Sequence, residues 1–103
     1  MWYYNTTLIF QLICKLLEMY YMITDSVNKD FQLHFGKKLK EIRTLKKLSY
    51  RQLDALTSLD HSYISKIEKG DINVTLDTVL ELAKGLKVTT KELFDFEFYF
   101  EDK

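Results

Sequence analysis

The chain has 103 residues with 15 basic and 15 acidic side chains, so it has room for one small domain and its net charge excludes no partner. Cys14 is the only cysteine, which excludes an intrachain disulfide and predicts a reducing, cytoplasmic location. Cys14, His34 and His61 form no spaced ligand set, and no nucleophile–base pair or glycine-rich phosphate loop stands out. We therefore expect no metal, no cofactor and no enzymatic activity.

Residues 1–30 are interpreted as an apolar N-terminal segment followed by a polar linker over residues 24–30. The apolar run approaches the length of a membrane span, but Lys15 and Glu18 interrupt it, and it lacks the basic start and cleavage site of a signal peptide. Three interpretations remain open: an extra helix that packs on the domain or on a second subunit, a weak membrane anchor, or a segment that is not translated. Met19 and Met22 are available starts, and the third interpretation is favoured because the apolar run matches nothing that the domain needs. We expect no membrane partner.

Residues 36–95 carry the pattern of a small helical domain. Leu39 and Ile42 have helical spacing within residues 37–46, and Gly70 is a natural helix end. Helix starts are predicted from capping residues at Ser49, Asp60, Thr75 and Thr89, with Gln52 and Glu92 completing two capping boxes. About five helices joined by short links predict an all-α fold.

Residues 96–103 form an aromatic and acidic tail, which could be a short strand or a helix extension. Its aromatic side chains are Phe96, Phe98, Tyr99 and Phe100. Because exposed aromatic side chains would make an adhesive patch, we expect this tail to be buried or to contact a second subunit.

Charge is unevenly distributed along the chain. Nine basic and four acidic residues lie between Lys37 and Gly70, whereas residues 71–103 hold eight acidic and four basic ones. A basic centre beside an acidic tail predicts a polyanion site together with a separate surface. The alternative is a lysine-rich helix that is merely solvated.

The predicted helix from Asp60 to Lys69 has two different faces. Ile64 and Ile67 share one face, whereas Ser62, Ser65, Lys66 and Lys69 point the opposite way at about 100° per residue, with His61 on the flank. Hydroxyls, an imidazole and ammonium groups are poor core formers, so this polar face predicts a binding surface. Small soluble surface residues remain the alternative.

Two short helices joined by a tight turn at Ser58–Leu59 have helix-turn-helix spacing. The segments LKEIR, LSYRQL, SYISKIEKG, LDTVLELAKGLKV and KELF follow one another between Leu39 and Phe94. In this order and at these intervals they resemble the Cro/cI-like (xenobiotic-response-element type) helix-turn-helix regulators. The resemblance implies a five-helix, lambda-repressor-like DNA-binding domain, here with an additional apolar N-terminal helical segment.

The resemblance also implies which residues contact double-stranded DNA. The second helix of the motif enters the major groove in this family, so its outward residues are expected at base edges. These are His61, Ser62, Ser65 and Lys66. The residues expected at phosphates are Tyr50, Arg51, Lys69 and Asn73. Arg43 and Glu68 stand where the family pairs an arginine with a glutamate, so we interpret them as a structural ion pair.

Several positions depart from the family pattern. Tyr50 replaces the usual glutamine, Asp54 replaces a small residue at a tight contact, and Ser58 replaces a turn glycine. Asp54 must find a hydrogen-bond donor or swing outward. Lys87 stands where a glycine often ends the fourth helix.

The predicted function is sequence-specific DNA binding by a dimeric repressor, with half-sites about one helical turn apart in a pseudo-palindrome. We expect the dimer contact at the fifth helix and the aromatic tail. Two alternatives share the fold: the antitoxin of a toxin–antitoxin pair, which would add a protein partner, and the controller of a restriction–modification system. A third alternative is an interaction or membrane-associated adaptor that does not bind DNA.

Overall fold

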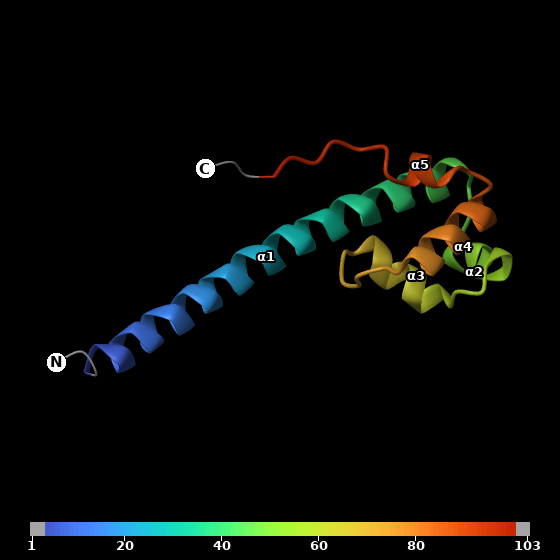
Figure 1. Cartoon of the computed structure of the whole chain (residues 1–103). Coiled ribbons are helices and arrows are strands. Elements are labelled where there is room, and N and C mark those ends of the chain that lie inside the picture. Colours follow the sequence, from blue (N-terminus) through green and yellow to red (C-terminus); the bar gives the residue numbers. More distant parts are fainter. Residues whose placement is uncertain (1–3, 101–103) are drawn as a thin grey trace.

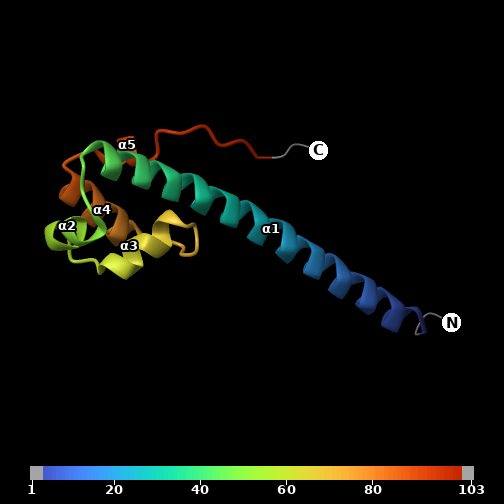
Figure 2. The ribbon, with the colours of Figure 1, turned by 180° about the vertical axis from the view of Figure 1, so that it is seen from behind.

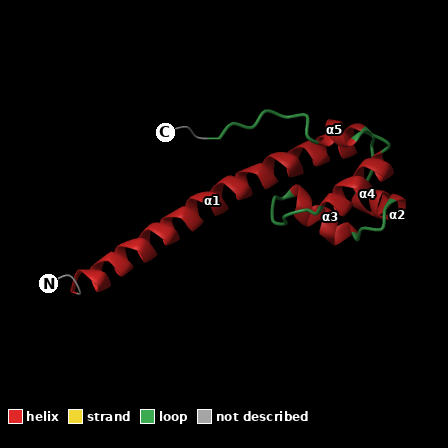
Figure 3. Ribbon diagram, viewed as in Figure 1, coloured by secondary structure: helices red, strands yellow, loops and turns green. Residues whose placement is uncertain are grey.

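The computed structural model describes residues 4–100, and within that range it contains five helices and no strand (Figure 3). The helices are α1 (Tyr4–Leu45), α2 (Tyr50–Leu56), α3 (His61–Glu68), α4 (Leu76–Leu86) and α5 (Thr90–Leu93). The expectation of an all-α fold with an added N-terminal helical segment is confirmed.

Helix α1 is one continuous helix of 42 residues, and its N-terminal half extends beyond the other helices in both ribbon views (Figures 1 and 2). The linker expected over residues 24–30 is helical instead, and the helix expected over residues 37–46 is the last part of α1. The physical reason is that the chain has no proline, and its first glycine is Gly36, so nothing interrupts the helix earlier. Within residues 4–100, no helix combines the length and the hydropathy needed to cross a bilayer.

The core lies where α3 and α5 pack against the C-terminal part of α1, with α2 packed on α3 and α4 packed on α2 and α5 (Figure 1). Its buried apolar side chains include members from every helix: Phe35, Leu39, Ile42, Leu53, Ile64, Ile67, Val79, Leu82, Ala83, Leu86 and Leu93. Leu39, Leu53, Ile64, Leu82 and Leu93 are completely buried. This cluster is what holds α2 and α3 in a fixed relation to α1.

The helices after α1 begin at the predicted capping residues. Ser49 accepts a hydrogen bond from the Gln52 backbone amide, and the Gln52 side chain bonds back to the Ser49 amide, which completes the capping box. Asp60, Thr75 and Thr89 cap α3, α4 and α5 in the same way, and Glu92 completes the second box. Local hydrogen bonding therefore decides where these short helices start.

Three helices end with a residue in the left-handed region. Gly70 ends α3 with φ 78°, but lysines occupy the equivalent positions after α1 and α4, Lys47 with φ 59° and Lys87 with φ 58°. At all three ends, the amide of the following residue bonds a carbonyl five residues earlier, for example Val88 to Ala83 at 3.0 Å. Ser58 is not among the positive-φ residues of the described chain, so the α2–α3 turn does not need the glycine that it lacks.

The tail after Phe94 runs back along α1 towards the N terminus as an irregular segment, neither the strand nor the helix that the sequence allows (Figure 1). The ring of Phe31 on α1 lies tilted against Phe96, 5.5 Å between centroids, and edge-on to Phe98 at 5.1 Å. Tyr99 and Phe100 remain exposed. Phe96 and Phe98 are therefore partly buried, and the burial expected for the tail does not extend to Tyr99 and Phe100.

Candidate nucleic-acid interface

Helix α3 presents a polar face outward because its other face is held in the core. Ile64 and Ile67 are buried, and Glu68 is buried beside them. Ser62 and Lys66, one helical turn apart, are exposed, and Ser65 between them is partly exposed. The two faces predicted from the sequence are therefore present.

Arg43 and Glu68 form the predicted pair between α1 and α3. Arg43 Nε donates to Glu68 Oε2 at 2.6 Å, and Nη2 donates to Oε1 at 3.1 Å, with the two side chains only 9% and 2% exposed. Arg43 Nη1 also donates to the Leu48 carbonyl at 2.7 Å. The hydrogen bonds to Glu68 raise the pKa of Arg43 above its ordinary value. This bidentate pair ties the end of α3 to α1.

Tyr50 completes that cluster instead of standing free for a phosphate. Its hydroxyl donates to Glu68 Oε1 at 2.9 Å, and its ring lies under the Arg43 guanidinium, 4.2 Å from centroid to Cζ. A phosphate oxygen needs a donor, and this phenolic proton is already engaged. In this structure the Tyr50 side chain therefore stabilises the Arg43–Glu68 pair, which differs from the phosphate contact expected from the sequence.

Gly36 allows α1 to approach the end of α3 very closely. A Cβ at this position would lie 2.4 Å from the Ile67 carbonyl oxygen and 2.6 Å from that of Glu68. These are backbone atoms, which cannot move aside as a flexible side chain can. A side chain at residue 36 would therefore push α3 away from α1 and change its angle.

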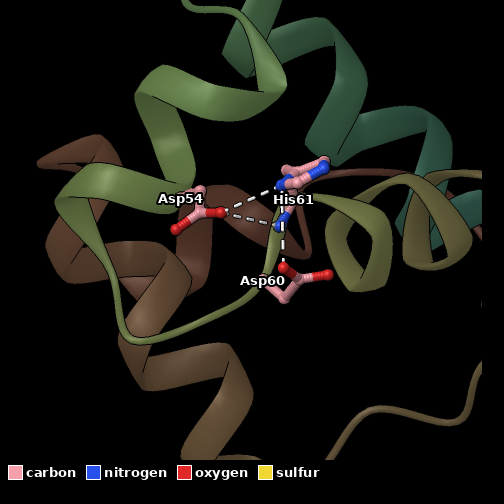
Figure 4. Close-up of side chains that lie close together, drawn as sticks. All are labelled: Asp54, Asp60 and His61. Atoms are coloured by element: carbon pink, nitrogen blue, oxygen red, sulfur yellow. Dashed lines mark hydrogen bonds and ion pairs between the residues drawn. The ribbon is translucent and has the colours of Figure 1, made fainter.

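Asp54 and Asp60 surround His61 at the start of α3 (Figure 4). Asp54 Oδ2 accepts from the His61 backbone amide at 3.0 Å and lies 3.2 Å from His61 Nδ1. Asp60 Oδ1 lies 3.6 Å from the same Nδ1. Asp54 thus finds its donor in the backbone of α3, which links α2 to the first residue of α3. Contacts at Nδ1 leave Nε2 as the ring atom of His61 that is turned to other partners.

Ser62 has its hydroxyl directed at the capping residue. Both its backbone amide and its Oγ donate to Asp60 Oδ2. These hydrogen bonds lower the pKa of Asp60 below its ordinary value. Ser62 is exposed, but a base would meet a hydroxyl whose proton is already shared with Asp60, so only its lone pairs are free.

The cationic and amide side chains of the interface are exposed. Arg51 lies in the first turn of α2, Lys66 in the last turn of α3, and Lys69 and Asn73 follow α3. Within residues 4–100, none of the three cationic side chains, Arg51, Lys66 and Lys69, is engaged in an ion pair. They are therefore free to meet the negative charge of phosphates.

Asp54, Asp60 and His61 each offer one ligand atom, and these atoms lie within 4.8 Å of one another. The sequence does not indicate this grouping, since Cys14, His34 and His61 form no spaced ligand set. The same oxygens already accept backbone amides of His61 and Ser62, so capping accounts for the arrangement. The signal that could have found it is Asp54 itself, an acid at a contact where the helices meet.

Comparison with known proteins identifies the family to which this chain belongs. The helix-turn-helix family profile matches residues 39–93. The chain is 38% identical over 71 residues to the control protein C.BamHI of Bacillus amyloliquefaciens, covering 68% of this chain and 88% of that protein. It is 41% identical over 66 residues to the control protein C.MunI of a Mycoplasma species, covering 63% and 89%. The crystal structure of the restriction–modification controller C.AhdI from Aeromonas hydrophila is similar, with a TM-score of 0.60 and 43% identity over 61% of this chain and 96% of that one.

Proposed function

Because this chain belongs to the helix-turn-helix family of DNA-binding transcriptional regulators, we propose that it binds a pseudo-palindromic operator as a dimer and controls a restriction–modification system. In this proposal α3 is the recognition helix and lies in the major groove. The observation that carries it is the outward polar face of α3, fixed to α1 by the buried Arg43–Glu68 pair.

Lys66 is the proposed main base contact. Its ammonium group is exposed on α3 and can donate to guanine O6 and N7. His61 contributes through Nε2, the ring atom turned away from Asp54 and Asp60, and Ser65 lies between these two residues along the helix. Ser62 supports the start of α3 through Asp60 and offers only an acceptor to a base.

Arg51 and Lys69 are the proposed phosphate contacts on either side of the recognition helix, and Asn73 adds an uncharged one. Contacts to phosphates carry no sequence information, but they orient α3 and make binding depend on salt. The carboxylates of Asp54 and Asp60 oppose this attraction locally, so the flanking cations have to outweigh them.

Binding-site selection from random duplex DNA with the full chain tests the proposal. We expect an inverted repeat with half-sites about ten base pairs apart. Lys66→Ala should relax the preference at particular bases and cost about 1–3 kcal/mol, whereas Arg51→Ala should weaken all sequences alike and reduce the salt slope by about one unit. Lys91→Ala on α5 removes the same charge away from α3 and is the matched control. If the folded protein selects no DNA sequence, the proposal that α3 recognises bases is refuted.

Control of a restriction–modification system is favoured over the antitoxin role because the relatives described above are named as control proteins. The test is the position of the selected operator in the source genome. An operator upstream of an endonuclease or methyltransferase gene supports the proposal. An operator beside a small toxin gene supports the antitoxin alternative instead.

A further inference from the structure

The N-terminal arm is defined as residues 8–27 of α1, and over residues 8–19 it leaves large apolar side chains in solvent. Those from residue 8 to residue 19 are between 49% and 66% exposed: Leu8, Ile9, Phe10, Leu12, Ile13, Leu16, Leu17 and Met19. In both ribbon views this part of α1 has no other element beside it (Figures 1 and 2). A single chain therefore leaves the arm without a partner.

The apolar side chains of the arm follow the repeat of a coiled coil. Apolar residues alternate at spacings of four and three along the chain: Ile9, Ile13, Leu16, Tyr20, Ile23 and Val27. With Ile13 at position a and Leu16 at position d, Gln11, Lys15 and Glu18 occupy only positions c and f. The opposite side, called here the polar back, also carries Leu8 at position c and Cys14 at position b. An apolar seam that holds no charged residue is what two helices need to pair.

The area available is large enough for a stable contact. At about 200 Å² for a fully exposed large side chain, the eight exposed side chains present on the order of 900 Å² of mostly apolar surface. Monomers rarely expose patches above roughly 300–600 Å², whereas a stable interface buries about 800 Å² on each partner. The arm therefore matches an interface better than it matches the free surface of a monomer.

The described part of the chain's own tail, up to Phe100, does not cover residues 8–19. Phe98 contacts Phe31, and only two further described residues follow it, a reach of about 7 Å in extended chain. Met19 lies twelve residues before Phe31, which is about 18 Å along the helix. The tail up to Phe100 therefore covers the side of α1 near Phe31 and leaves residues 8–19 open.

We propose that the arm pairs with the arm of a second copy of this chain, as a parallel two-stranded coiled coil. This contact on α1 takes the place of the dimer contact at α5 and the aromatic tail that the sequence led us to expect. The proposal rests on the proposed dimeric DNA binding for its orientation. Half-sites one turn apart need recognition helices about 34–36 Å apart. Parallel arms hold the two helical domains side by side at one end of the coil. Antiparallel arms would place Gly36 of one chain about 55 Å or more from Gly36 of the other.

Parallel pairing also brings like residues together without penalty. Lys15 and Glu18 of both copies lie on the polar back, away from the seam, so no like charges meet in the contact. Ile13 and Val27 at position a with Leu16 at position d favour two strands, whereas Ile9 and Ile23 at position d favour three or four. The choice of two strands therefore rests on the proposed dimeric DNA binding. Phe10 and Leu17 at position e extend the apolar contact along its edge.

The mass of the full chain in solution, measured by analytical ultracentrifugation, tests whether the partner is a second copy. Wild type should have twice the 12.3 kDa mass of one chain at micromolar concentration. Ile13→Lys with Leu16→Lys places charges in the seam and should halve this mass, while Thr7→Lys with Gln11→Lys adds the same charges on the polar back and should leave the dimer intact. A monomeric wild type, a trimer or tetramer, or a seam variant that remains dimeric would each overturn the proposal. Flotation of wild type with phosphatidylcholine vesicles would also overturn it, since the arm would then bind lipid.

Crosslinking tests the orientation. In a Cys14→Ser background, Ile9→Cys should form an interchain disulfide within minutes of mild oxidation, because position 9 meets itself only in parallel, in-register arms. Gln11→Cys on the polar back is the control and should crosslink much more slowly. Equal rates for the two cysteines would overturn the parallel arrangement.

Binding to a single half-site separates this proposal from the proposed function. The monomeric seam variant should lose at least about 100-fold in affinity for the full operator, since avidity is lost, and keep its affinity for one half-site. If Lys66→Ala changes half-site binding while the seam variant stays dimeric, the coiled coil is wrong and DNA reading by α3 stands. If wild type dimerises through the arm but neither protein selects a sequence, the proposed function fails and the coiled coil stands.

Discussion

Removing the guanidinium of Arg43 should destabilise the protein strongly, because it strands a buried charge. Arg43→Met keeps the length of the side chain but leaves Glu68, 2% exposed, with the Tyr50 hydroxyl as its remaining side-chain partner. Breaking a buried pair in this way costs about 3–5 kcal/mol. The variant also leaves the part-buried Leu48 carbonyl without its donor.

This loss is a large share of the total free energy of unfolding, which is about 5–15 kcal/mol for a domain. Urea unfolding followed by far-UV circular dichroism measures it directly, since the core is helical. We expect the transition midpoint to fall with little change in slope. At the same time the affinity for DNA should decrease, because the pair fixes the recognition helix on α1.

The double variant Arg43→Met with Glu68→Leu distinguishes the cost of a stranded charge from the loss of contacts. With both charges gone, the apolar side chains can pack in the same volume, and we expect most of the lost free energy to return. The coupling energy from the double-mutant cycle should then be several kcal/mol. The reasoning fails if Arg43→Met costs less than about 1 kcal/mol, or if the double variant is no more stable than Arg43→Met.

Four further changes test separate parts of the structure. Tyr50→Phe should cost about 1–3 kcal/mol in urea unfolding, since a donor to a buried carboxylate is lost, and change DNA affinity less than threefold in a binding titration. Gly36→Ala should cost about 1–3 kcal/mol or more, because its Cβ would meet backbone oxygens at 2.4 and 2.6 Å. Lys87→Gly should gain up to about 1 kcal/mol, since φ is 58°, whereas Lys84→Gly within α4 should lose a similar amount. Asp60→Asn should flatten the acid dependence of stability below pH of about 4, where wild type loses the contribution of Asp60.

The sign of the Asp60 effect follows from its hydrogen bonds. Ser62 lowers the pKa of Asp60 in the folded state, so the carboxylate stabilises the fold above its unfolded pKa of about 4. That contribution is lost as the pH falls through the lower, folded value. Asparagine caps a helix about as well but does not titrate. Urea unfolding between pH 6 and 2.5 compares the two proteins, and parallel curves of stability against pH would contradict the lowered pKa of Asp60.

The sequence by itself determined the local features of this protein. Capping residues such as Ser49, Asp60 and Thr89 mark helix starts because each bonds an amide only two or three residues away. The alternation of buried and polar positions on α3 likewise follows from helical geometry over eight residues. Family resemblance supplied the pairing of Arg43 with Glu68, which spacing alone does not reveal.

Only the tertiary structure decided contacts between side chains that lie far apart in the chain. Tyr50 contacts Glu68 eighteen residues away, and this replaces the phosphate contact that its position in the motif suggested. Phe98 contacts Phe31, which lies near the other end of the chain. The tail packs its rings on α1 as an irregular segment and needs no neighbouring strand. Local sequence pattern also does not determine that α1 is continuous, since the polar residues 24–30 are compatible with a linker or with a helix. Sequence spacing describes which residues share a face, but which face meets which neighbour depends on how all helices fill one core.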